Sequence, residues 1–149
     1  MNIILLGGNN IGNKQWLDNI TIAFTPHFDS LYVHQYRHWT TGEELIDIDL
    51  ELSELSKKLP TKPYMIAAKS AGVLLALKGI QEQVLAPQKC IFFGTPIPWA
   101  KKNNFETDKW VQQYTVPTLF IQQTHDPILP FNDLQDYLQQ TNIKNHQLF

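Results

Sequence analysis

The amino-acid sequence predicts an α/β protein, with a parallel sheet of about six strands at the centre of a three-layer α/β/α sandwich. Short apolar runs recur along the chain, as is typical of strands that are buried on both faces of a sheet. Longer segments whose apolar residues have helical spacing separate these runs. Strands that alternate with helices form right-handed βαβ units, so the sheet is expected to be parallel.

The expected strands are short and rich in aliphatic, aromatic and β-branched residues. In chain order they are residues 3–6, 31–36, 64–68, 90–93, 118–121 and 146–149. The first is followed directly by two glycines. Since the runs are almost continuously apolar, we expect strands that are covered by helices on both faces.

The segments between the strands predict amphipathic or buried helices. These cover residues 16–24, 45–59, 71–80 and 131–138, with room for one more helix between residues 93 and 117. For the second helix, Thr41 and Glu44 have the spacing of a capping box, and Pro60 ends the pattern. Residues 71–80 are almost wholly apolar, which predicts a helix buried against the sheet.

Length and composition limit the classes of protein that fit. The chain has 149 residues, which predicts a single domain over residues 1–149. A formal net charge of −2 argues against a nucleic-acid partner, and Cys90, the one cysteine, excludes an internal disulfide and a cysteine-based zinc site. No signal peptide or membrane-spanning run is visible, so we expect a soluble, cytoplasmic protein without a membrane partner.

The sharpest motif is Ala68-Lys69-Ser70-Ala71-Gly72, between an expected strand and an expected helix. A serine between small residues in such a turn is typical of a nucleophile elbow, with alanine in place of the usual first glycine. The turn lifts the hydroxyl above the carboxyl end of the sheet, and the helix N-terminus provides amide groups for an oxyanion. The alternative is that Ser70 only caps the helix.

A second motif, Gly7-Gly8-Asn9-Asn10, follows the first strand. A dinucleotide-binding G-x-G-x-x-G pattern would need glycine at position 9, where the chain has Asn9. A P-loop would need Lys and then Ser or Thr directly after Gly12, where the chain has Asn13 and Lys14. The glycine pair therefore favours close approach of the backbone to a ligand other than a nucleotide.

A third motif places Asp126, followed by Pro127, just after the strand at residues 118–121. An aspartate at the end of a strand is well placed to orient an imidazole. The alternative is a turn aspartate that caps the next helix.

Together the three motifs resemble the α/β-hydrolase fold superfamily, over essentially the whole chain. The resemblance implies Ser70 as nucleophile and Asp126 as the acid of a catalytic triad, in the family's order. It also implies that the N–H groups of Asn9 and Ala71 form the oxyanion hole. The strand order is then expected to be 2-1-3-4-5-6, with Ser70 at the carboxyl end of the third strand.

The resemblance implies a small, lidless serine hydrolase that cleaves an ester or related acyl bond of a small-molecule substrate, without a metal or organic cofactor. The sequence departs from the family's pattern in the position of the histidine that would act as general base. His146 lies only 20 residues after Asp126 and within the last expected strand, so it is a weak candidate for the general base. We therefore expect a chain truncated at its C-terminus, or alternatively a non-catalytic binding protein of the same fold that lacks the base.

Overall fold

The computed structural model describes residues 1–149 and contains one six-stranded sheet. Every adjacent pair of strands is parallel, and the order is β2-β1-β3-β4-β5-β6. The strands are β1 (Asn2–Leu6), β2 (Ser30–His34), β3 (Tyr64–Lys69), β4 (Lys89–Phe93), β5 (Thr118–Ile121) and β6 (His146–Leu148). The parallel sheet, its strand number and its order are confirmed.

The helices connect these strands. They are α1 (Asn13–Phe24), a short 3₁₀ turn at Thr25–His27, α2 (His38–Thr41), α3 (Ile48–Ser56), α4 (Ala71–Gln81), α5 (Ile97–Lys102), α6 (Thr107–Val111) and α7 (Phe131–Gln140). The single helix expected between residues 93 and 117 is wrong. Two short helices occupy this segment, because the chain turns between them at Asn104, whose φ is +62°.

The capping box expected at Thr41 and Glu44 is also wrong. Thr41 ends the short helix α2, and α3 begins later, where the Asp47 carboxylate accepts a 3.0 Å hydrogen bond from the Leu50 amide. Residues 42–46 stay outside a helix because the carbonyl of Glu44 and the amide of Ile46 are hydrogen-bonded to the side chain of Asn9.

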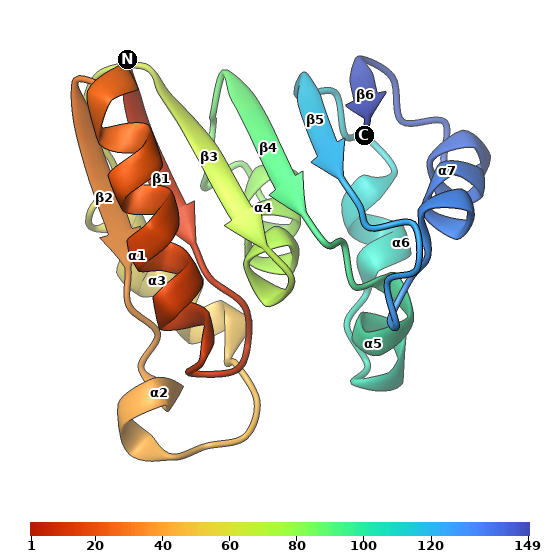
Figure 1. The fold of residues 1–149 in the computed structure, drawn as a ribbon, viewed down its shortest axis with the longest axis horizontal. Coiled ribbons are helices and arrows are strands. Elements are labelled where there is room, and N and C mark those ends of the chain that lie inside the picture. Colours follow the sequence, from red (N-terminus) through yellow and green to blue (C-terminus); the bar gives the residue numbers. More distant parts are fainter.

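Helices cover the two faces of the sheet unequally. In Figure 1, α1 lies over β1 and β2 on one face, and α3 and α4 lie behind the sheet on the other. All five residues of β1 are buried, whereas β4 and β5 alternate between buried and partly exposed side chains. The partly exposed side chains include Ile91, Phe93, Leu119 and Ile121. The expectation that every strand is covered on both faces therefore holds for β1 but not for β4 and β5.

The parallel arrangement places the loops that follow the strands at one edge of the sheet, toward which the arrowheads in Figure 1 point. The glycine loop after β1, the segment after β2, Ser70 after β3 and the loops after β4 and β5 all belong to this carboxyl edge. Ligands of open α/β sheets bind at such an edge. No helix is long and apolar enough to cross a membrane.

Candidate active site

Ser70 stands in the tight turn that the sequence predicts. It joins β3 to α4 with φ of +51° and ψ of −117°, outside the main regions that residues with a Cβ adopt. Its amide donates a 3.0 Å hydrogen bond to the carbonyl of Phe93, which continues the pairing of β3 with β4. The hydroxyl makes no side-chain hydrogen bond, and α4 has no side-chain cap at Ser70, so the capping alternative is not what the geometry shows.

The turn is possible because Gly72 has no side chain. A Cβ at this position would lie 2.7 Å from the carbonyl oxygens of both Leu6 and Gly7, closer than real Cβ atoms come to any neighbour. The first turn of α4 therefore packs directly against the backbone where β1 ends. This contact brings the elbow and the glycine loop to the same point of the sheet edge, although Gly72 and Gly7 are 65 residues apart in the chain.

Asn9 and Ala71 carry the two predicted oxyanion donors. Ala71 is the first residue of α4, and its amide points out of the helix N-terminus without an intrahelical acceptor. The side chain of Asn9 is fixed: Nδ2 donates to the carbonyl of Glu44 at 2.7 Å, and Oδ1 accepts from the amide of Ile46 at 2.8 Å. The backbone amide of Asn9 donates no hydrogen bond in the structure.

Asp126 lies in the loop after β5, and its two carboxylate oxygens have different surroundings. Oδ1 accepts hydrogen bonds from the amides of Ile128 at 2.8 Å and Leu129 at 3.0 Å. Oδ2 lies 3.9 Å from the position that a Cβ on Gly94 would occupy. Gly94 directly follows Phe93, the partner of the Ser70 amide, so Gly94 stands between the two candidate residues along the sheet edge.

Gln122 is a buried side chain at this edge that sequence reasoning missed. Its Oε1 accepts a 2.9 Å hydrogen bond from the amide of Thr95, and its Nε2 donates a 2.5 Å hydrogen bond to the carbonyl of Leu129. It thus ties the loop after β4 to the loop that contains Asp126. No feature of the sequence distinguishes this glutamine from the others, because its role depends on two contacts across the sheet edge.

His146 is not placed to act on Ser70. It is the first residue of β6 and pairs with Thr118, the first residue of β5, at the amino edge of the sheet. Its Nδ1 is hydrogen-bonded to the carbonyl of Ile143 at 2.8 Å. The pleat of β6 and this bond fix the ring at the edge opposite to Ser70.

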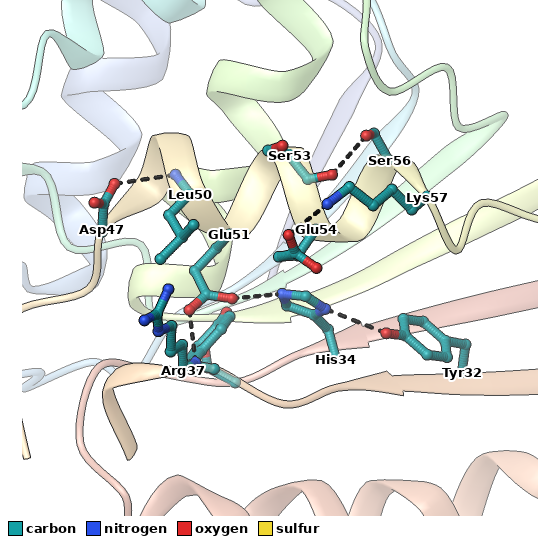
Figure 2. A network of polar contacts seen from close by, with 12 residues as sticks. Tyr32, His34, Arg37, Asp47, Leu50, Glu51, Ser53, Glu54, Ser56 and Lys57 are labelled. Carbon is teal, nitrogen blue, oxygen red and sulfur yellow. Dashed lines mark hydrogen bonds and ion pairs between the residues drawn. The ribbon is translucent and has the colours of Figure 1, made fainter. Parts of the chain in front are cut away.

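The remaining histidines have other surroundings. His27 is exposed at the end of the 3₁₀ turn, and His125 is exposed beside Asp126. His34 is buried and bound through Nε2 to the carboxylate of Glu51 at 2.8 Å (Figure 2). His38 is buried against the glycine loop, where its Nε2 is 2.6 Å from the carbonyl of Asn9. No histidine is hydrogen-bonded to Ser70 or to Asp126.

The network around His34 is a separate feature of the β2 side of the molecule. Glu51 of α3 also accepts a 2.7 Å hydrogen bond from the amide of Arg37, and Tyr32 Oη is 3.4 Å from His34 Nδ1 (Figure 2). The network joins α3 to the end of β2 and so contributes to holding the segment that follows this strand. No group of three or more His, Cys, Asp or Glu side chains could hold a metal ion.

Comparison with known proteins identifies the fold. No protein-family model and no curated sequence matches the chain. A crystal structure from Pectobacterium atrosepticum, described as a putative YdeN-like hydrolase, matches 99% of this chain and 74% of its own, with a TM-score of 0.73 and 20% identity.

A second crystal structure shows the same architecture. It is a serine-to-alanine variant of N-formylmaleamic acid deformylase from Pseudomonas putida, with a TM-score of 0.71 and 7% identity over 99% of this chain and 82% of that one. With the parallel sheet, its order and the turn at Ser70, these matches show that the chain has the α/β-hydrolase fold.

Proposed function

We propose that this protein is a serine hydrolase that cleaves an ester or related acyl bond of a small substrate, with Ser70 as the nucleophile. The observation that carries the proposal is the backbone of Ser70, held at φ of +51° between a buried strand and a buried helix. A strained conformation of this kind costs about 1–3 kcal/mol and persists at functional sites where the surroundings enforce it. Similarity to structures described as a hydrolase and a deformylase supports the same class of reaction.

In the proposed reaction, the hydroxyl oxygen of Ser70 attacks the carbonyl carbon of the substrate. The negative charge that develops on the carbonyl oxygen is bound by the amides of Asn9 and Ala71 and by the N-terminus of α4. Collapse of the tetrahedral intermediate releases the alcohol, which takes up a proton. Water then attacks the acyl-serine, releases the acid and returns the proton to Ser70.

The proton of Ser70 needs an acceptor, and Asp126 is the proposed partner of that acceptor. Oδ1 of Asp126 is already occupied by two backbone amides, which leaves Oδ2 for an imidazole on the side of Gly94. An aspartate in this role orients the imidazole and stabilises its charged form. Because His146 lies at the other edge of the sheet, it is not the proposed base.

The second candidate is a binding protein of the same fold that performs no catalysis. The observation that favours it is the hydroxyl of Ser70, which has no hydrogen bond to a histidine. Such a protein would keep the elbow and the glycine loop and bind an acyl compound or a carboxylate at the same edge of the sheet.

Reaction with a fluorophosphonate probe and turnover of p-nitrophenyl acetate separate the two candidates. The hydrolase proposal expects slow turnover that Ser70→Ala abolishes and Asp126→Asn lowers, together with labelling of Ser70. Without a triad base, a hydrolase site keeps about 10³–10⁴-fold catalysis over water from the oxyanion hole and substrate binding. Turnover equal in Ser70→Ala and the unmodified chain would instead support the binding protein.

A further inference from the structure

Three aromatic side chains that follow β2 hold the backbone of the glycine loop. Tyr36 Oη donates a 2.8 Å hydrogen bond to the carbonyl of Gly7. The carbonyl of Asn9 accepts hydrogen bonds from Nε2 of His38 at 2.6 Å and from Nε1 of Trp39 at 2.9 Å. All three rings are buried, with 1%, 5% and 7% exposure for Tyr36, His38 and Trp39.

The rings are themselves fixed by their packing. The Tyr36 ring stacks on His38 with the centroids 5.6 Å apart, and it contacts Trp39 at 4.8 Å. The Trp39 ring lies 3.0 Å from where a Cβ on Gly7 would be, so it packs on that glycine. Since a carbonyl oxygen only accepts hydrogen bonds, Nε2 of His38 carries the proton, and its Nδ1 is buried without a partner.

These contacts restrain the peptide groups on both sides of the Asn9 amide. A peptide group is planar, so a fixed carbonyl also fixes the amide of the next residue. Tyr36 holds the peptide between Gly7 and Gly8, and His38 with Trp39 holds the peptide between Asn9 and Asn10. The side chain of Asn9 is anchored as well, to residues 44 and 46. The peptide that carries the Asn9 amide therefore lies between restrained neighbours.

We infer that Tyr36, His38 and Trp39 are positioning residues that set the direction of the Asn9 amide and thereby the strength with which it binds an oxyanion. The kinetic part of this inference rests on the proposed function, because it needs an acyl-transfer reaction at Ser70. Stabilisation of an oxyanion depends on donors that are fixed before the charge develops, so loosening the donor acts on the transition state more than on bound substrate.

The kinetic test removes the bonds to the Asn9 carbonyl one at a time. Trp39→Phe keeps most of the ring and loses the indole donor, and His38→Leu loses the imidazole donor. We expect kcat for Ser70-dependent ester turnover to fall about tenfold in each with KM unchanged, less than the ~10²–10³-fold typical of losing a donor outright. His38→Gln, whose amide can donate to the same carbonyl, should recover part of the loss.

The matched control is Trp110→Phe, which changes a similarly buried indole in α6 that makes no hydrogen bond. An equal fall of kcat in Trp110→Phe would mean a general effect of packing and would overturn the inference. So would a kcat in Trp39→Phe equal to that of the unmodified protein. If no Ser70-dependent turnover exists at all, the proposed function fails, and the next measurement decides the inference alone.

That measurement is the NMR order parameter of the Asn9 amide, which needs no activity. A rigid backbone amide has a value near 0.85, and a flexible one lies below about 0.6. We expect the rigid value in the unmodified protein and in Trp110→Phe, and the flexible range when Trp39→Phe and His38→Leu are combined. A rigid Asn9 amide in the combined variant would show that these side chains do not position it.

Discussion

Ser70 combines a side chain with a backbone conformation that side chains disfavour. Its φ of +51° is one of five positive values at residues other than glycine, and the other four are Gln83, Asn104, Asn142 and Asn145. Asparagine adopts such conformations readily in turns, whereas serine has no comparable preference. The conformation at Ser70 is held by the pairing with Phe93 on one side and by the packing of Gly72 on the other.

Replacing Ser70 by glycine should therefore relieve strain. Ser70 is the N-cap of α4. At an ordinary N-cap, glycine is already better than alanine, because replacing serine costs a few tenths of a kcal/mol for glycine and about 0.5–2 kcal/mol for alanine. At Ser70 we expect a larger difference in the same direction, with a free energy of unfolding for Ser70→Gly that exceeds the value for Ser70→Ala by more than about 2 kcal/mol, since only alanine keeps a Cβ at positive φ. Urea denaturation of both variants measures the difference. A difference no larger than that of an ordinary N-cap would contradict the strain assigned to this turn.

The contact at Gly72 predicts a large loss of stability from a small change. A Cβ there would meet two backbone oxygens at 2.7 Å, and backbone cannot move aside as a side chain can. We expect Gly72→Ala to lower the free energy of unfolding by about 1–3 kcal/mol, in the range of overpacking in a core, and Gly72→Leu to prevent stable folding.

Gly12→Ala is the matched control for this prediction. A Cβ at Gly12 would meet only a side-chain oxygen of Asn10, at 3.2 Å, and the backbone there is already helical. If the thermal unfolding midpoint of Gly72→Ala equals that of the unmodified protein, the elbow does not pack directly against the backbone at the end of β1.

At the scale of elements, the position of β6 decides whether His146 can accept the proton of Ser70. Its register with β5 runs from Thr118 with His146 to Phe120 with Leu148, so His146 stands at the amino edge and the strand leads away from it toward the carboxyl edge. No adjustment of a side-chain rotamer spans the length of a strand. The position of the element, more than the identity of the residue, excludes His146 as the base.

This position predicts that His146→Ala leaves Ser70-dependent turnover unchanged. Free imidazole added to the assay should raise that turnover with saturation, because it can occupy the space between Asp126 and Ser70 and accept the proton. The rise should be absent in Ser70→Ala and smaller in Asp126→Asn. A loss of activity in His146→Ala that matches the loss in Ser70→Ala would make His146 the base and contradict the placement of β6.

The sequence predicts which helices and strands exist better than it predicts where they end or which faces of the strands are covered by helices. The apolar run at residues 118–121 coincides with β5, and the other strands differ from their predictions by one or two residues at either end. The start of α3 was missed because Glu44 and Ile46 bond to Asn9, a contact between distant segments. The open face of β4 and β5 was missed because an apolar side chain does not reveal whether a helix covers it.

In the candidate site, too, some residues have a local sequence signal and others depend on contacts between distant segments. Ser70 could be proposed from the sequence because the elbow leaves a local pattern of small residues around it, and Asp126 because it follows a strand. The roles of Tyr36, His38 and Trp39 depend on where β2 ends relative to β1, which no local pattern encodes. A signal existed in hindsight: three aromatic rings with polar atoms follow a strand whose end lies at the same edge as Ser70.

At the scale of the whole molecule, the core contains acidic groups that burial keeps protonated. Burial raises the pKa of the Cys90 thiol from its ordinary value of 9.0 to about 12, despite hydrogen bonds from Tyr114 and Thr118 that lower it. Burial also raises the pKa of Tyr36 and of Tyr114 well above the ordinary value. In the unfolded chain these groups ionise near pH 9 and 10, so the folded state holds more protons above those values.

Stability should therefore be complete below about pH 9 and fall as the pH rises toward 12. Between pH 9 and 10 the Cys90 thiol contributes up to about 1.4 kcal/mol per pH unit. Burial raises the pKa of all five tyrosines as well, so they add to the slope in this range and dominate it above pH 10. Urea denaturation at several pH values measures this, with Cys90→Val as the variant that lacks the first contribution. Equal slopes for Cys90→Val and the unmodified protein between pH 9 and 10 would contradict the prediction.

Because β1 lies between β2 and β3, its position affects how the protein folds while the ribosome is still synthesising it. Asn2 pairs with Tyr64 on one side, so β1 cannot complete its pairing until 62 further residues have been made. At about 5–20 residues per second, the run Ile3 to Leu6 waits roughly 3–12 s for its second neighbour. During that time β1, whose five residues are all buried in the finished sheet, is the part of the nascent chain that a chaperone would bind.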